Sequence, residues 1–102
     1  MTKYQEYYKK MRSENEAVFA QFAAVHASYE LDKEKYEAEF HRLGQQVVDV
    51  IRDWERRLCA SMGRGKYSNY THTLAEKFWS VARKEFANID MVGVRVRTVK
   101  VA

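Results

Sequence analysis

The chain has 102 residues, of which 46% are hydrophobic and 31% are charged, and it contains no proline. This length predicts one domain, residues 1–102, and the apolar content excludes an intrinsically disordered chain. The net charge of +4 is uneven, because residues 63–102 contain eight Lys or Arg against three Asp or Glu.

The apolar residues are too interspersed for a membrane protein. No stretch approaches the roughly 18 consecutive apolar residues of a transmembrane helix, and residues 1–10 lack the apolar region of a signal peptide. Cys59 is the single cysteine and cannot form a disulfide within the chain. We therefore expect a cytoplasmic protein that does not associate with membranes.

The first predicted helix covers about residues 2–30. Steps of four and three separate the apolar residues of its stripe, which are Tyr4, Tyr8, Met11, Val18, Phe22, Val25 and Tyr29. Asn15 occupies one position of this stripe. A polar Asn in such a seam fixes register and oligomeric state in coiled coils, although Asn15 could also lie exposed at the edge of a bundle.

Two capping-box patterns leave the start of this helix open. Thr2 to Gln5 and Ser13 to Glu16 both have the spacing in which each end of the motif satisfies a free backbone N–H. Residues 2–10 could therefore be a separate arm, but we expect one continuous helix.

A second apolar stripe predicts a helix over about residues 33–62. Its members are Tyr36, Phe40, Leu43, Val47, Val50, Trp54 and Leu58, and they are out of phase with the first stripe. The similar lengths of the two halves favour a helical hairpin that turns near residues 29–33. The absence of Gly and Pro at that point favours a continuous rod of about 90 Å instead. We expect the hairpin, with Gly44 permitting either close packing or a bend.

The C-terminal forty residues are predicted to contain a loop, a helix and a strand. Residues 61–72 are polar and contain two glycines, and Thr73 to Glu76 form a capping box that opens a helix over about residues 73–88. Residues 92–101 alternate Val with Arg and predict a β-strand. A lone strand leaves its backbone unpaired, so it must pair with residues 2–8, with a second copy or with another protein.

The residues that could carry chemistry do not form a recognised motif. His26 with Glu30 and Glu37 with His41 are four residues apart, and we interpret them as charge pairs on a solvated face. The Gly63 to Lys66 segment resembles the end of a phosphate-binding loop but lacks the Ser or Thr that should follow. We therefore expect neither an enzyme nor a metal or cofactor.

Together, these elements predict that the protein belongs to the mainly α fold class and forms a helical bundle with long, coiled-coil-like helices. We hypothesise that it is a non-enzymatic interaction module that assembles with itself or acts as an adaptor, scaffold or regulator of another protein. Aromatic stripes and the C-terminal strand would supply the interface. The residues expected there are Tyr8, Asn15, Phe22, Trp54, Val94 and Val96.

The alternative hypothesis is nucleic-acid binding by the basic region, residues 63–102. Interleaved basic and aromatic side chains can contact phosphates and stack on bases. The residues expected to do so are Arg64, Lys66, Tyr67, Tyr70, Arg95, Arg97 and Lys100.

Overall fold

Four α-helices account for most of the residues that the structure describes. The computed structural model describes residues 2–61 and 68–93, with the backbone alone for residues 68–72. The elements are α1 (Lys3–Glu14), α2 (Glu16–Leu31), α3 (Lys33–Ser61), α4 (Ser68–Glu85) and a short 3-10 turn, η2 (Ile89–Met91). The prediction of a mainly helical fold is confirmed for this part of the chain.

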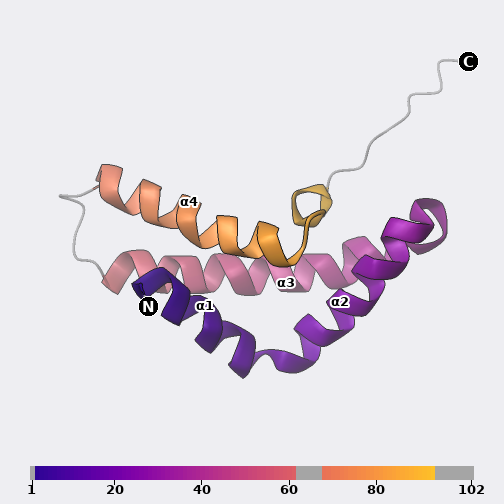
Figure 1. Cartoon of the computed structure of the whole chain (residues 1–102), viewed down its shortest axis with the longest axis horizontal. Helices are drawn as coiled ribbons and strands as arrows, with labels where there is room; N and C mark the ends of the chain where they lie inside the picture. Colours follow the sequence, from indigo (N-terminus) through magenta and orange to yellow (C-terminus); the bar gives the residue numbers. More distant parts are fainter. Residues whose placement is uncertain (1, 62–67, 94–102) are drawn as a thin grey trace, which may run out of the picture.

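Helices α2 and α3 form an antiparallel hairpin, whereas the alternative of a continuous rod is wrong (Figure 1). The chain turns at Asp32, whose backbone is extended. Its N–H still donates to the carbonyl of Ser28 at 2.9 Å, and its Oδ1 accepts the N–H of Lys35 at 3.2 Å. Asp32 thus closes one helix and caps the next, which explains how the turn forms without Gly or Pro.

The first predicted helix is not continuous, because it breaks at Asn15. The N–H of Asn15 and its side-chain Nδ2 both donate to the carbonyl of Met11 at 3.0 Å. An Asn side chain that bonds to the backbone in this way competes with the helix. Asn15 therefore ends α1 and redirects the chain into α2 (Figure 1), so it does not lie inside one continuous helical stripe.

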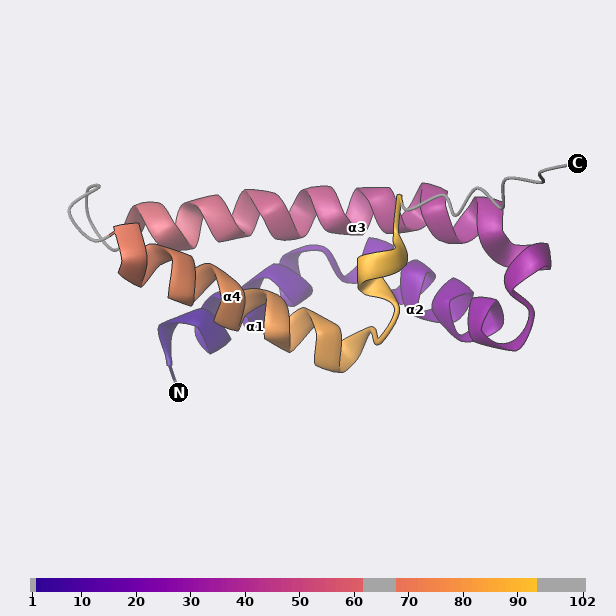
Figure 2. The ribbon, with the colours of Figure 1, turned by 90° about the horizontal axis from the view of Figure 1, so that it is seen from above.

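Helix α3 is the axis of the bundle. Helix α2 lies beside its first half, and α1 and α4 lie beside its second half (Figure 2). The described chain measures 51 × 32 × 18 Å. Burying one apolar face of each helix against α3 drives this arrangement. The largest fully buried side chains are Phe19, Phe22, Phe40, Phe78, Met11, Ile51, Leu58, Ile89 and Val47.

Gly44 lets Val92, in the segment that follows α4, approach α3 closely. A Cβ at this position would lie 2.5 Å from Cγ2 of Val92 and 3.0 Å from Cε1 of Phe22. Helix α3 continues through Gly44. Close packing, and not a bend, is therefore the role of this glycine.

The C-terminal elements differ from the prediction in their bounds. Helix α4 begins at Ser68, so Thr73 lies inside it and does not cap it; no Gly or Pro between residues 68 and 73 opposes helix there. The helix ends at Glu85, three residues earlier than expected. Val92 and Gly93, the first two described residues of this stretch, form a turn and not a strand. Residues 94–101 of the predicted strand lie outside the described residues.

Candidate interaction surface on helix α2

The aromatic residues expected at an interface lie inside the chain. Phe22 is fully buried, and Tyr8 and Trp54 are each 6% exposed. The ring of Tyr8 packs edge-on against Phe78, and that of Trp54 packs edge-on against Tyr7. A partner surface must therefore use other residues.

Apart from Asn15 between α1 and α2, most of the remaining predicted contact residues lie outside the described residues. Val94 and Val96, and the basic or aromatic residues Arg64, Lys66, Tyr67, Arg95, Arg97 and Lys100, lie outside the described residues. Tyr70 lies in the first turn of α4, where the backbone alone is described. The anion-binding residues are consequently not brought together at any described site.

Helix α2 has a second apolar face that the chain leaves uncovered. Its members follow one another in steps of three and four along the exposed side, and they are Ala17, Ala20, Ala24, Ala27 and Leu31. Leu31 is 90% exposed and is the one large hydrophobic side chain that is exposed among the described residues. A helix that is apolar all round is normally buried. We define these five residues as the alanine face.

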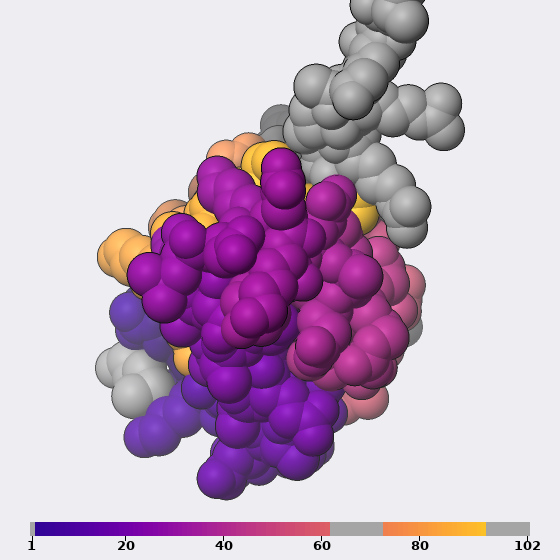
Figure 3. Space-filling model, turned by 90° about the vertical axis from the view of Figure 1, so that its right-hand side faces the viewer, coloured from indigo at the N-terminus to yellow at the C-terminus, as the bar shows by residue number. Residues whose placement is uncertain are grey.

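Charged residues are confined to the two ends of α2. Glu16 and Glu30 stand at its first and penultimate positions, and the two titratable residues between them, His26 and Tyr29, are both buried. Along one side, a shallow hollow separates α2 from α3 and is lined by Ala24, Ser28 and Tyr36 among others. Figure 3 looks onto this end of the molecule, where the purple atoms of α2 lie beside the magenta atoms of α3. The alanine face thus carries no charged side chain, whereas Glu39 and Arg42 of α3 line the hollow beside it.

The sequence contained a signal for this face. In the sequence, Ala17, Ala20, Ala24, Ala27 and Leu31 form a second stripe with its own heptad spacing beside the buried one. Alanine is compatible with both buried and exposed positions of a helix, so composition alone does not assign its side.

A polar contact joins α1 to the C-terminal end of α4. The hydroxyl of Tyr8 donates to Oε1 of Glu85 at 2.6 Å, and Nε of Arg12 donates to both oxygens of the same carboxylate at 2.9 and 2.8 Å. Burial, followed by the hydrogen bond to Glu85, raises the pKa of Tyr8 above its ordinary value of 10.0, and the nearby Arg12 opposes this less strongly. The tyrosine thus keeps its proton in the folded chain at high pH.

This contact predicts a loss of stability in alkali. Above pH 10 the unfolded chain releases the Tyr8 proton while the folded chain keeps it, so the free energy of unfolding falls as pH rises. The effect is at most about 1.4 kcal/mol per pH unit. Urea unfolding from pH 8 to 11 should show the advantage of the wild type over Tyr8→Phe shrinking above pH 10. Parallel profiles for the two proteins would contradict this.

The described residues show no constellation for metal chemistry. No group of three or more His, Cys, Asp or Glu side chains within them is arranged to hold a metal ion. None of the described helices is both long enough and apolar enough to cross a membrane.

Comparison of the chain with models of protein families, with characterised proteins and with solved structures finds no match.

Proposed function

We propose that this protein is a non-enzymatic interaction module that associates with a second copy of itself through the alanine face of α2. The observation that supports this is the exposed, uncharged stripe from Ala17 to Leu31 at heptad spacing. Small side chains allow two helix axes to approach closely, and a stripe at this spacing matches the seam of a helix pair.

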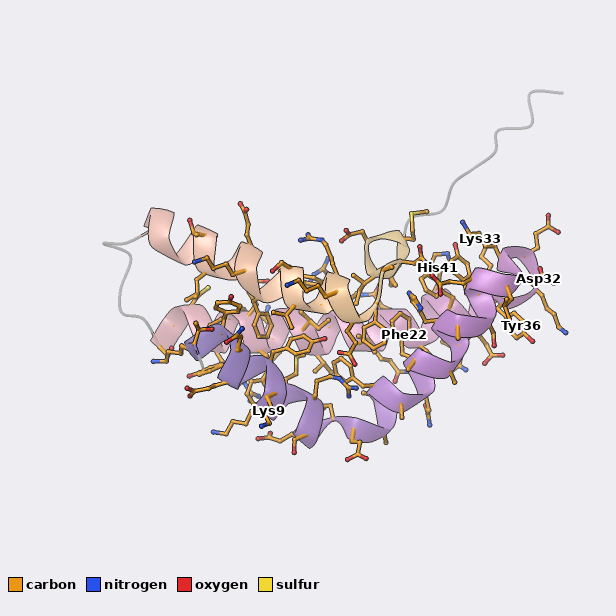
Figure 4. All side chains as sticks on the ribbon, viewed as in Figure 1. Lys9, Phe22, Asp32, Lys33, Tyr36 and His41 are labelled. Carbon is orange, nitrogen blue, oxygen red and sulfur yellow. The ribbon has the colours of Figure 1, made fainter. Side chains whose placement is uncertain are left out.

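The charges at the two ends of α2 favour an antiparallel pair. Glu14 and Glu16 are exposed near its start, and Lys33 and Lys35 are exposed just beyond its end, with Lys33 visible at the hairpin tip in Figure 4. The tip is mixed in charge, because Glu30, Asp32 and Glu34 are exposed there as well, but antiparallel pairing brings Glu16 of each copy toward Lys35 of the other. A parallel pair would place like charges together.

One register of the antiparallel pair aligns the two alanine faces and also keeps the charged residues beside them from facing like charges. When Ala24 of one copy faces Ala27 of the other, Leu31 packs on Ala20 and Glu30 lies opposite the uncharged Gln21. The arrangement has twofold symmetry, so each contact occurs twice. A single helix pair covers less than the roughly 800 Å² per partner of a standard interface, and we therefore expect a reversible, concentration-dependent dimer.

The test is the molar mass in solution over a range of concentration. Sedimentation equilibrium between about 10 µM and 1 mM should show the wild type rising toward twice the 12.1 kDa of one chain. Ala24→Glu places a charge at the centre of the seam, where desolvating it opposes association. This variant should remain monomeric throughout.

The matched control is Ala38→Glu, because Ala38 is also an exposed helical alanine but lies on α3. It should dimerise as the wild type does, and circular dichroism should show both variants folded. A wild type that stays monomeric at the highest concentration, or an Ala24→Glu variant that dimerises equally, would overturn the proposal. Tight binding of a different protein to a monomeric wild type would show that the face serves a foreign partner.

The second candidate function is nucleic-acid binding. It is favoured by the balance of eight basic against three acidic residues in residues 63–102. In the described structure Lys84, one of these eight, lines a hollow together with Lys9 and Arg12 of α1, and Glu16 of α2 lines the same hollow. Affinity for single-stranded DNA or RNA that falls steeply with salt would support this function, since neutralised phosphates release counterions.

A further inference from the structure

The segment that follows α4 lies across the hairpin of α2 and α3. We define Phe86–Gly93 as the strap; it contains η2 (Figures 1 and 2). Phe86 and Ile89 are each 2% exposed, and Val92 packs against Gly44. The strap therefore covers apolar surface of the hairpin.

Two histidines, one from each arm of the hairpin, hold the strap by its backbone. The N–H of Asn88 donates to Nε2 of His26 on α2 at 3.1 Å. The N–H of Gly93 donates to Nδ1 of His41 on α3 at 3.0 Å. Figure 4 shows His41 on the hairpin next to the end of the strap. Both rings act as acceptors. The expected pairs with Glu30 and Glu37 are present, but the expectation of a solvated face is wrong for His26, which is buried.

A backbone N–H can be accepted only by a ring nitrogen that carries no proton. When the ring is protonated, both nitrogens are donors, and the N–H of the strap then faces another donor. His26 is only 8% exposed and packs against the rings of Phe22, Phe40 and Phe86. Water does not easily reach this site, so the loss of the hydrogen bond from Asn88 would leave a buried N–H without an acceptor.

A carboxylate stands beside the other nitrogen of each ring. Oε1 of Glu30 is 3.9 Å from Nδ1 of His26, and Oε1 of Glu37 is 4.0 Å from Nε2 of His41. Each carboxylate thus lies near the ring nitrogen that does not accept an N–H of the strap. Glu30 also accepts the side-chain Nδ2 of Asn88 at 3.1 Å.

The other charged groups near the strap do not replace these acceptors. Glu34 and Arg42 line the same hollow as His41. Asp90 of the strap accepts Nε of Arg83 at 2.9 Å, which joins the strap to α4 and not to the hairpin. Within the described residues, His26 and His41 thus accept the backbone hydrogen bonds that the strap donates to the hairpin.

We propose that His26 and His41 form a proton-sensitive clasp that releases the strap from the hairpin as the pH falls. Histidine changes charge between about pH 8 and pH 5, a range in which ordinary carboxylates remain mostly ionised. Release uncovers Phe22 and Gly44 and so opens an apolar groove between the arms of the hairpin. This device is independent of the alanine face, which lies on the opposite side of α2.

The test is hydrogen exchange of single backbone amides by NMR at about pH 7.5 and pH 5.5. The protection factors of the Asn88 and Gly93 amides, corrected for the intrinsic pH dependence, should fall at least about tenfold on acidification. The amide of Asp32, which donates to Ser28 at the hairpin turn, should keep its protection.

The control protein carries His26→Gln and His41→Asn. The amide oxygens of Gln and Asn reach the positions of Nε2 and Nδ1, accept an N–H and do not titrate. Asn88 and Gly93 should be protected equally at both pH values in this variant. Equal protection of the wild type at both pH values would overturn the proposal, as would a general loss of protection that includes Asp32.

Discussion

Replacing Phe22 by alanine is expected to lower the free energy of unfolding by about 3–5 kcal/mol, the usual cost of removing a buried Phe ring. Phe22 is fully buried and its ring packs against those of His26, Phe40 and Phe86. These neighbours come from α2, α3 and the strap. The cavity would therefore lie where three segments meet, and none of them can close it alone.

Urea unfolding followed by circular dichroism measures this change. Domains of this size are stable by only about 5–15 kcal/mol, so the variant should unfold at a markedly lower urea concentration. Phe22→Leu is the matched control, because it retains most of the apolar volume and should lose clearly less. An alanine variant within about 1 kcal/mol of the wild type would show that the ring is not central to the core.

Replacing Gly44 by leucine is expected to cost about 1–3 kcal/mol through overpacking, even though leucine is the better helix former by nearly 1 kcal/mol. The first atom of any side chain at this position already comes within 2.5 Å of Val92. Val92 is β-branched and has few alternative rotamers, so the strap has to move away. Phe22, at 3.0 Å, also limits the available space.

A double-mutant cycle with Val92→Ala separates these contributions. Removing the γ-methyl groups of Val92 gives the new leucine room, so the double variant should lose less than the sum of the two single variants. Strict additivity would mean that the strap does not contact Gly44 in solution. Unfolding free energies of the four proteins provide the measurement.

The break at Asn15 shows how a local signal can be interpreted in two ways. The apolar stripe passes through this position without interruption, which predicted one helix over residues 2–30. The side chain of Asn15 instead bonds to the carbonyl of Met11 and ends α1. Both conformations satisfy the backbone locally, and packing of α1 and α2 on different halves of α3 selects the broken one (Figure 2).

The roles of His26 and His41 could not be predicted from the sequence, for a different reason. In the sequence each histidine stands four residues from a glutamate, but its role as an acceptor depends on backbone groups that are 62 residues away for His26 and 52 residues away for His41. Neither helical periodicity nor motif spacing contains that information. The strap itself has no regular pattern beyond the short turn at Ile89–Met91.

The sequence by itself determined the mainly helical class and the long helix that became α3, because helical periodicity and capping depend on residues only a few positions apart. It also contains no recognisable catalytic motif. Only the tertiary structure decided which apolar stripe is buried. Tyr8, Phe22 and Trp54 face inward because α1, α4 and the strap cover them, whereas the alanine face of α2 has no covering element in the described chain. Burial is a property of the whole assembly of helices, so no single helix specifies it.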